Sequence, residues 1–489
     1  MIRPTLKETR ELAKGHTLVP VALEVFSDLT TSIRVLKNLS EKGGNYYLLE
    51  SVATGDAWGR YSFLGCDPGL VLRGRDGKVT AERGGTKEAV AGAPLDVLAQ
   101  AFARSKSPRV EWLPPFTGGF VGYFSYEFAR YAEPSLLLNA QDPEGFDDFC
   151  LMKMDKVVAF DHFRQKIILI ANADVSDPAK IEENYIEAVA ALKDMERLVL
   201  AQPGATDIRP GECGDFTARF SREEYCAKVL CAKQYIKEGD IFQAVLSNRF
   251  SAPFAGSLLC AYRTLRTTNP SPYMVYMRFE DLEVACTSPE TLVSLRGRTL
   301  HTYPLAGTRP RAESPDADSR LERELLADEK ELAEHDMLVD LGRNDLGKVS
   351  AFGSVKVEEY RHIKRFSHVM HISSRVSGEL AEGKTALAAL CAALPAGTLS
   401  GAPKKRAMEI IDELEGLKRG LYGGALGYIA FTGNMDLCIG IRMAVHKNGK
   451  VFVQAGGGVV ADSLPENEYE ETRGKARAIV NALKGGREA

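Results

Sequence analysis

Apolar runs of strand length and segments with helical spacing alternate irregularly along the N-terminal part of the chain. Apolar or β-branched runs bounded by turn residues predict strands, and apolar positions at helical spacing predict helices. We therefore expect strands at 45–52, 69–73, 118–124, 156–160 and 166–171, and helices at 32–40 and 180–198. The turn-rich stretch 201–214 predicts a linker, which makes residues 1–200 a first expected domain.

Residues 215–489 form the second expected domain. Ser221-Arg-Glu-Glu224 is a capping-box signature for a helix that runs to about Glu238. The run 321–341 holds strong helix formers without Pro or Gly, which predicts one acidic helix. We also expect strands within 273–303, 370–376 and 422–460, helices at 386–394 and 405–415, and a C-terminal helix. Because βαβ units do not alternate regularly, the pattern predicts an α+β fold.

Composition and charge narrow the classes of protein. A formal net charge of −4 and a pI near 6.2 argue against a nucleic-acid partner. No apolar run reaches the ~18 residues that a membrane helix needs, and the N-terminus lacks an apolar signal core. The nine cysteines include no Cys-x-x-Cys. We interpret them as reduced thiols of a cytoplasmic protein without a membrane segment.

Two pairs of glutamates share one spacing on two predicted helices. Glu331 and Glu334 project from nearly the same face of the acidic helix, and Glu468 and Glu471 repeat the pattern near the C-terminus. A solvated acidic face explains one such pair, but two pairs could form an all-oxygen cage. Such a cage suits Mg²⁺, which takes few carboxylates and keeps several waters. Zinc fits poorly because neither pair has the His or Cys ligands that zinc prefers.

One stretch offers an alternative from another class of protein. Gly378-Glu-Leu-Ala-Glu-Gly-Lys384-Thr385 matches the P-loop pattern of nucleotide-binding proteins. However, Glu379 and Glu382 would place negative charge against a phosphate, and no apolar strand ending in Asp follows. A surface turn before a helix explains these residues as well, so nucleotide binding is the weaker hypothesis.

Three further features have both a structural and a functional interpretation. Gly456-Gly457-Gly458 is either a flexible turn or a backbone without side chains that lets a ligand carboxylate contact its amides. Arg442 follows an apolar strand and needs an anion or a carboxylate, because a buried unpaired charge is costly. His371 alone is more often a packed histidine than a catalyst.

Taken together, the motifs of this chain resemble one family. That family is component I, the synthase subunit, of the anthranilate synthases within the chorismate-utilising enzymes. The resemblance covers almost the whole chain and is densest from Phe220 to Ala478. The motifs that carry it are Gly-Asp-Ile-Phe-Gln243, Tyr303-Pro-Leu-Ala306-Gly307-Thr308-Arg-Pro-Arg311, the stretch Glu334 to Asp345, Val369-Met-His371, the stretch Pro395 to Lys404, Tyr422-Gly-Gly-Ala-Leu-Gly-Tyr428 and Pro465-Glu-Asn-Glu-Tyr-Glu-Glu-Thr472.

The resemblance implies a fold, a lyase activity and a set of site residues. The fold would pack mixed or antiparallel sheets together with helices outside, and the reaction would add ammonia to chorismate and release pyruvate and anthranilate. Glu334 and Glu471 would hold Mg²⁺ at the ring carboxylate, with Glu331 and Glu468 reaching the ion through water. The other implied roles are the pyruvyl carboxylate contacts of Arg442, Tyr422, Gly456, Gly457 and Gly458, the ring contacts of Gly307, Thr308 and Thr398, acid–base catalysis by His371, and outer support from Lys475. This chain has Gly-Gly-Gly at 456–458 where the family usually has Gly-Ala-Gly.

The resemblance also implies feedback inhibition by L-tryptophan in the first step of tryptophan biosynthesis. Leu48-Leu-Glu50-Ser51 resembles the family's feedback motif, and 269–274 resembles its opposite wall. The implied inhibitor contacts are Glu50, Ser51, Arg60, Pro272, Tyr273, Met274, Leu426 and Tyr428.

The sequence also bears on which nucleophile attacks the substrate and on where that nucleophile comes from. We find no Cys in a Gly-x-Cys-x-Gly setting, so ammonia is expected to come from solution or from a separate subunit. The resemblance implies a glutamine amidotransferase subunit, component II, in a heterotetramer. Water-using isochorismate or salicylate synthases carry Lys where this chain has Gln243, and aminodeoxychorismate synthases carry Lys where it has Ala306. Gln cannot take a proton at neutral pH but can position ammonia. A regulatory partner that only binds tryptophan is a third alternative, which the intact Glu334, His371 and Glu471 oppose.

Overall fold

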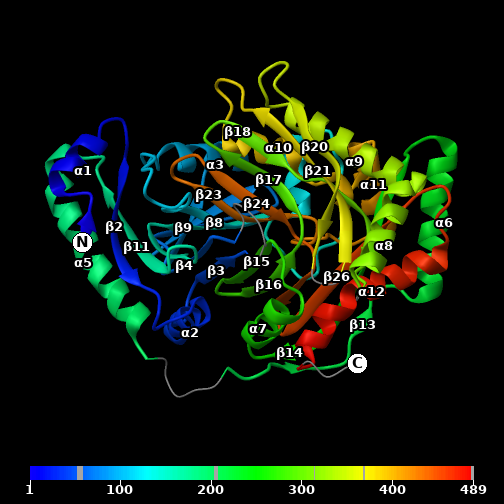
Figure 1. Cartoon of the computed structure of the whole chain (residues 1–489), viewed down its shortest axis with the longest axis horizontal. Coiled ribbons are helices and arrows are strands. Elements are labelled where there is room, and N and C mark those ends of the chain that lie inside the picture. Colours follow the sequence, from blue (N-terminus) through cyan, green and yellow to red (C-terminus); the bar gives the residue numbers. More distant parts are fainter. Residues whose placement is uncertain (52–58, 203–207, 313, 367–368, 486–489) are drawn as a thin grey trace.

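The computed structural model describes residues 1–51, 59–202, 208–312, 314–366 and 369–485. Two large antiparallel sheets lie at the centre of the molecule, and most helices lie outside them (Figure 1). The helices are α1 (Leu6–Leu12), α2 (Ser32–Lys42), α3 (Pro94–Ala103), α4 (Ala129–Ala132), α5 (Ile181–Leu200), α6 (Arg222–Glu238), α7 (Leu259–Thr268), α8 (Pro315–Ala327), α9 (Glu329–Gly347), α10 (Ala386–Ala393), α11 (Lys404–Glu415) and α12 (Pro465–Leu483), with short 3₁₀ turns η1 (Tyr126–Phe128), η2 (Pro178–Lys180) and η3 (Gly397–Leu399). This arrangement confirms the predicted α+β class.

The first sheet contains 14 strands within the described residues. Its spatial order is β1 (Ile2–Arg3), β2 (Leu18–Phe26), β11 (Lys166–Asp174), β10 (Lys156–Asp161), β4 (Tyr61–Cys66), β3 (Tyr46–Glu50), β15 (Tyr273–Arg278), β16 (Leu282–Ser288), β25 (Met443–Lys447), β26 (Lys450–Val459), β14 (Gln243–Ala255) and β12 (Glu212–Cys213), while β13 (Thr217–Ala218) and β22 (Gly401–Ala402) also pair with β14. Helices α2, α5, α7 and α12 bury apolar side chains against one face of this sheet.

The second sheet contains 12 strands over the same described ranges. Its order is β19 (Leu305–Pro310), β21 (Val369–Glu379), β18 (Thr299–Thr302), β17 (Thr291–Arg296), β24 (Met435–Ile439), β23 (Ala425–Ala430), β8 (Gly119–Phe124), β9 (Phe149–Met154), β5 (Leu70–Arg75), β6 (Lys78–Arg83) and β7 (Thr86–Val90), and β20 (Lys356–Arg365) pairs with β21. One apolar core joins the two sheets, because Tyr47 and Phe63 of the first cluster with Phe120 and Tyr123 of the second.

Both sheets take strands from both predicted domains. In the first sheet β3 pairs with β15, so that Leu49 lies opposite Val275. In the second sheet β8 pairs with β23, where Gly122 lies opposite Gly427. We call these two pairings the seams. The domain boundary at 201–214 stays a prediction, although one segment of that stretch, β12, is itself a strand paired with β14.

The single acidic helix predicted at 321–341 is wrong, because two helices occupy this region. Asp328 has extended backbone angles and separates α8 from α9. Its carboxylate accepts hydrogen bonds from the backbone N–H groups of Lys330 and Glu331, and therefore caps α9. Glu331 consequently lies in the first turn of α9, and Glu334 follows one turn later on a similar face.

The stretch that matches the P-loop pattern forms a surface connection between β21 and α10. Its backbone N–H groups already donate to protein acceptors, in the pairs Glu379 to Ser354 Oγ, Leu380 to Arg298 O, Ala381 to Val349 O and Lys384 to Ala381 O. Thr385 caps α10 through a hydrogen bond from Ala388 N–H. These bonds support the surface-turn interpretation over a phosphate cradle.

Among the described residues, no helix is both long and apolar enough to cross a bilayer. All nine cysteines are free thiols.

Candidate functional site

A cavity of about 630 Å³ brings together nearly all of the predicted catalytic, substrate and metal residues. We call it the acidic cavity because the carboxylates of α9 and α12 form one of its walls. Strands β14, β19, β21 and β26 and the turn η3 supply other walls. The predicted residues that line it are Gln243, Gly307, Thr308, Glu331, Glu334, His371, Thr398, Tyr422, Arg442, Gly456, Gly458, Glu468, Glu471 and Lys475. Gly457 lies just behind the wall, where a Cβ would be 2.6 Å from Glu468 Oε2.

The two glutamate pairs meet across the acidic cavity. Burial raises the pKa of Glu334, and the nearby charges of Glu331 and Glu471 raise it further. Burial also raises the pKa of Glu468, whose Oε2 is buried without a hydrogen-bond partner. Glu471 forms a 2.6 Å ion pair with Lys475, whose ammonium also donates to Gly456 O at 2.9 Å. The excess of carboxylates favours a positively charged ligand here.

These carboxylates fit a divalent cation that takes few protein ligands. Within the described ranges, no group of three or more His, Cys, Asp or Glu side chains is placed to hold a metal ion together. A site with two carboxylates and several waters is typical of Mg²⁺ rather than of zinc or calcium. The unpartnered Glu468 oxygen and the raised pKa of Glu334 are consistent with a cation at this wall.

Arg442 carries a buried positive charge toward the same cavity. Its backbone has φ of +52° at the connection between β24 and β25, which directs this residue out of the strand pattern. Burial lowers the pKa of its guanidinium, and among the described residues no side chain forms a hydrogen bond or ion pair with it. A buried arginine without a partner is costly, so an anion is the expected partner.

Three consecutive glycines, Gly456 to Gly458, lie at the end of β26, and we call this part of β26 the glycine strand. Without side chains there, the backbone can approach the other groups of the acidic cavity. A Cβ on Gly456 would lie 2.9 Å from Tyr422 Oη and 2.4 Å from Leu246 O, and a Cβ on Gly458 would lie 2.3 Å from Gln243 Nε2. Gly456 therefore requires glycine, because Leu246 O belongs to the backbone, whereas a Cβ on Gly458 would force the flexible Gln243 amide to move. This is the close approach that the sequence predicted as one interpretation.

Gln243 begins β14 and is only 2% exposed. Its Oε1 atom is buried without a hydrogen-bond partner. Leaving a buried acceptor unsatisfied costs about 1–3 kcal/mol, which favours a ligand with an N–H or O–H group at this position. Gln243 is therefore a buried strand residue and does not face solvent.

His371 of β21 is held as a neutral base. Its Nδ1 lies 2.9 Å from Gly307 O and 3.1 Å from Thr308 Oγ1. Because a carbonyl can only accept, Nδ1 carries the proton in this contact and Nε2 keeps a lone pair. Burial lowers the pKa of His371, and the positive charges of Arg442 and Lys475 lower it further, so the ring is neutral near pH 7.

The sequence analysis missed Glu290, which also lines the acidic cavity. It lies between β16 and β17, and burial raises the pKa of its carboxyl to about 8. Thr398 Oγ1 donates to both of its oxygens, at 3.2 and 3.3 Å. A carboxyl in this state is protonated near pH 7 and can donate a proton. A carboxylate between two apolar strands was the available signal.

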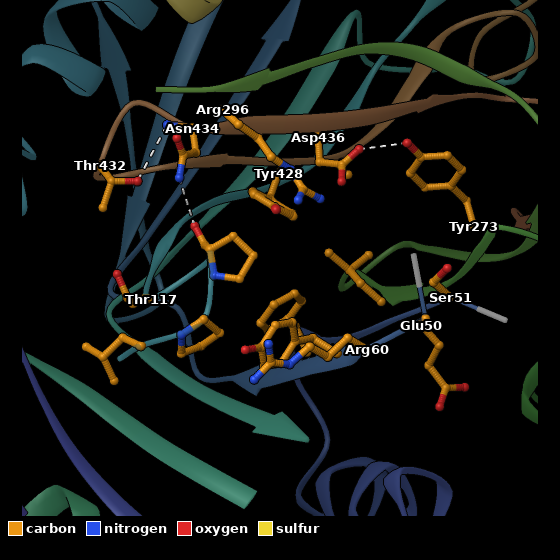
Figure 2. A pocket seen from close by; sticks show the side chains of 18 of the residues that line it. Glu50, Ser51, Arg60, Thr117, Tyr273, Arg296, Tyr428, Thr432, Asn434 and Asp436 are labelled. Carbon is orange, nitrogen blue, oxygen red and sulfur yellow. Dashed lines mark hydrogen bonds between the residues drawn. The ribbon is translucent and has the colours of Figure 1, made fainter. Parts of the chain in front are cut away.

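A second cavity, of about 680 Å³, lies between the seams and is shown in Figure 2. We call it the seam cavity. Its lining includes the predicted inhibitor contacts Glu50, Ser51, Arg60, Pro272, Tyr273, Leu426 and Tyr428. Met274 is not among the described lining residues, because it follows Tyr273 along β15 and its side chain packs in the core on the opposite face.

The polar groups of the seam cavity differ in their availability. The carboxylate of Glu50 accepts from Tyr262 and Arg266, at 3.0 and 2.8 Å, and points away from the middle of the cavity (Figure 2). Arg60 makes two hydrogen bonds to Asp161, at 3.1 and 2.8 Å. Ser51 Oγ, by contrast, is buried and has no hydrogen-bond partner within the part of the chain that the structure describes. Ser51 is thus the better-placed polar contact of the predicted pair.

Tyr273 links the two sheets at this cavity. Its hydroxyl lies 2.7 Å from Asp436 Oδ1 on β24 and 3.0 Å from Thr291 Oγ1 on β17. Burial raises the pKa of Asp436. The sequence analysis did not single out Asp436, which no local pattern distinguishes from an exposed hairpin residue.

Comparisons with known proteins agree with this geometry. A family described as chorismate binding enzyme matches residues 46–481. The chain belongs to this family. It is 46% identical to anthranilate synthase component 1 of Acetivibrio thermocellus over 99% of both chains, and 46% identical to that of Pseudomonas aeruginosa over 97% of both. These relatives place it in the component 1 group of enzymes within the chorismate-binding family.

Solved structures support the same assignment. The crystal structure of anthranilate synthase component I from Streptococcus pneumoniae has a TM-score of 0.78 and 36% identity, and the match covers 93% of this chain and 98% of that one. The menaquinone-specific isochorismate synthase of Escherichia coli shares the fold, with a TM-score of 0.71 at 18% identity over 98% of both chains. The predicted family and fold are confirmed.

The absence of a side chain at Gly458 determines where the Gln243 amide can lie. In Gly458→Ala the new Cβ would displace the Gln243 amide, which is the flexible end of a side chain. We expect the protein to fold with a melting temperature close to that of the wild type but to lose about 100-fold in kcat/KM, because small misplacements of reacting groups have effects of that size. Steady-state kinetics on chorismate and a thermal melt test this. Wild-type kinetics in the variant would contradict the close packing of Gln243 on β26.

Proposed function

We propose that this protein is the synthase subunit of an anthranilate synthase, which aminates chorismate with ammonia and eliminates pyruvate. One observation carries the proposal: in a member of the component 1 group, the guanidinium of Arg442, which is partly buried and has no ion-pair partner among the described residues, lines the same cavity as the carboxylates of α9 and α12. A substrate with two carboxylates would be complementary to both of these features. One carboxylate pairs with Arg442, and the other needs a cation between it and the glutamates.

The substrate is anchored at both ends of the cavity. Arg442, Tyr422 and the backbone of β26 bind the enolpyruvyl carboxylate. Glu334 and Glu471 would hold Mg²⁺, with Glu331 and Glu468 bonded through water, and a bound Mg²⁺ would supply the positive charge that offsets the ring carboxylate. Gly307, Thr308 and Thr398 lie along the ring, and Lys475 orients Glu471 through their 2.6 Å ion pair.

Gln243 orients the nucleophile in this proposal. Its unpartnered Oε1 accepts a hydrogen bond from ammonia, whose lone pair then faces the ring carbon beside the carboxylate-bearing carbon. Ammonia needs no base to attack, whereas water does. Gln243 and Ala306 therefore favour direct amination over the reactions of isochorismate, salicylate and aminodeoxychorismate synthases.

Two buried groups move the protons. Protonated Glu290, oriented by Thr398, donates to the ring hydroxyl, which leaves as water while the new amine gives up one proton in exchange. Neutral His371 then removes the hydrogen from the aminated ring carbon, the C–O bond to the enolpyruvyl group breaks, and the proton passes to the departing enolpyruvate. The products are anthranilate, pyruvate and water.

The proposal includes a partner, an inhibitor and a location. The relatives are named component 1, which supports a second component, and we propose that this component is a glutamine amidotransferase that delivers ammonia. L-Tryptophan binds the seam cavity, with its indole on the apolar walls and its amino and carboxylate groups at Ser51 and Arg60. The enzyme acts in the cytoplasm.

Product analysis tests the reaction and its pH dependence. Chorismate, Mg²⁺ and ammonium should yield anthranilate, detected by fluorescence and chromatography, and glutamine should not replace ammonium for the isolated chain. At fixed total ammonium the rate should rise with pH as ammonia is deprotonated. Divided by free ammonia, however, kcat/KM should fall above about pH 8, because Glu290 loses the proton that it donates. Glu290→Gln should remove this alkaline limb. Isochorismate, salicylate or a stable 4-amino product would overturn the proposal.

Metal removal tests the acidic wall. A chelator should abolish turnover, and added Mg²⁺ should restore it. Glu334→Gln and Glu471→Gln should each reduce kcat/KM by more than the ~10–100-fold that follows loss of an outer metal-site partner. Circular dichroism and a thermal melt show whether each variant still folds. Full activity in either variant would refute the cation site.

Ser51→Phe tests the inhibitor site. The new ring would occupy the space beside the unpartnered Ser51 hydroxyl, so tryptophan should bind at least 10-fold more weakly while the ammonium-dependent activity is retained. Titration of the activity with tryptophan and direct calorimetry give the two readouts. If tryptophan neither binds to nor inhibits the wild type, the regulatory proposal fails. Tryptophan can shift the equilibrium between the active and less active states by no more than the ratio of its affinities for the two states.

A further inference from the structure

We infer that Arg419, held by Glu415, is a positioning residue that sets the shape of the acidic cavity from behind its walls. Neither side chain is among the described residues that line this cavity. Both are almost fully buried, at 3% and 5% exposure. The inference rests on the proposed function, because it names what holds the proposed catalytic groups in place.

The guanidinium of Arg419 joins two backbone segments that line the cavity. It donates through Nη1 to Leu399 O and through Nη2 to Val245 O, both at 2.6 Å. Leu399 follows Thr398 in η3, and Val245 lies two residues after Gln243 on β14. One planar group therefore sets the separation between the segment that orients Glu290 and the segment that orients ammonia in the proposed reaction.

Glu415 extends this connection to the glycine strand. Arg419 Nε donates to Glu415 Oε2 at 2.9 Å, and Glu415 Oε1 accepts from both the N–H and the Oγ of Ser247, at 2.8 Å. Ser247 Oγ in turn accepts from Gln454 Nε2 at 2.8 Å. Gln454 lies on β26, two residues before Gly456. The ion pair thus reaches three walls of the cavity without contacting the substrate.

Arg419 also contacts Tyr422, the proposed neighbour of the enolpyruvyl carboxylate. The guanidinium carbon lies 5.5 Å from the centre of the Tyr422 ring and 4.7 Å from that of Tyr126, which are cation–π distances. The backbone of Arg419 is itself fixed, because Glu127 accepts from its N–H at 2.6 Å and from that of Gly420 at 3.1 Å. The position of the guanidinium is therefore well defined.

A buried ion pair of this kind does not by itself indicate a contribution to stability. Removing charges from water costs about as much as their attraction returns, and apolar replacements are often as stable. What the planar fork of arginine adds is several hydrogen bonds with fixed directions, which lysine cannot reproduce. Arg419 bonds directly to the segments that carry Gln243 and Thr398, and through Glu415 it is connected to the glycine strand. We therefore expect its loss to change the geometry of the acidic cavity more than the stability of the fold.

The experiment compares Arg419→Lys with a matched control. Arg419→Lys keeps the charge but loses the fork, so we expect the KM for chorismate to rise about 10-fold and kcat/KM to fall about 100-fold. Glu415→Gln keeps an acceptor for Ser247 and should show a smaller loss than Glu415→Ala. The control is Arg278→Met, which breaks another ion pair to a buried carboxylate, that of Glu283 at 3.2 Å, and neither residue lines the acidic cavity. It should lower the melting temperature and leave the KM within about twofold.

The readouts separate positioning from folding. Loss of folded protein lowers the apparent kcat but does not change KM. If Arg419→Lys lowers only the melting temperature and leaves KM and kcat per folded enzyme unchanged, the inference is overturned. If the wild type makes no anthranilate, the proposed function fails, and hydrogen exchange decides this inference separately. Faster exchange at 243–247 and 397–400 in Arg419→Lys, but not in Arg278→Met, would support it, and unchanged exchange there would refute it.

Discussion

The hydrogen-bonded seams between the N-terminal and C-terminal strands determine where the seam cavity lies, and they join it to the sheets that carry the acidic cavity. Pairing of β3 with β15 and of β8 with β23 makes each sheet continuous through the chain. The seam cavity forms where these strands face each other, with Tyr273 on β15 and Tyr428 on β23. The neighbouring strand β24 runs from Asp436 at this cavity toward Arg442 at the other. Without the seams, the walls of the seam cavity would not be assembled, whereas the acidic cavity is lined by residues of the C-terminal part.

Several polar groups of the acidic cavity are unsatisfied in a consistent way. Among the described residues, no side chain pairs with the Arg442 guanidinium, with Gln243 Oε1 or with Glu468 Oε2, and Glu334 faces like charges. Each of these groups raises the free energy of the folded chain, since buried polar atoms cost about 1–3 kcal/mol when unpaired. Because these groups occur together in one cavity, they indicate the kind of ligand that fits it. Such a ligand carries an anionic group at the Arg442 end, a group that binds through a cation at the glutamate end, and a hydrogen-bond donor beside Gln243.

The parts that sequence patterns predicted are those that depend on local bonds. The capping box at Ser221 placed the start of α6 correctly, because its hydrogen bonds lie within three residues. The acidic run was misread as one helix because Asp328 competes as a cap inside a strongly helical segment. Strand β2 was not predicted, and its Pro20 weakens the strand signal.

The candidate site residues were predicted from a resemblance, and their surroundings were not. Glu290 stands between two apolar strands, which is a local signal, but its raised pKa arises only when other elements of the fold bury it. Glu50 was expected to face a ligand, yet Arg266 and Tyr262 already engage its carboxylate. Such partners are more than 200 positions away in the chain, in α7, and periodicity cannot reveal them.

Continuous sheets also limit the kind of motion that can join the two cavities. A hinge between the N-terminal and C-terminal parts would have to break the backbone ladders at both seams, five residue pairs in one and six in the other. Small changes in twist and shear keep those ladders intact. Conformational coupling between the two cavities would therefore be an elastic deformation spread over many strands of a continuous sheet. It would not be a rigid-body closure of two domains.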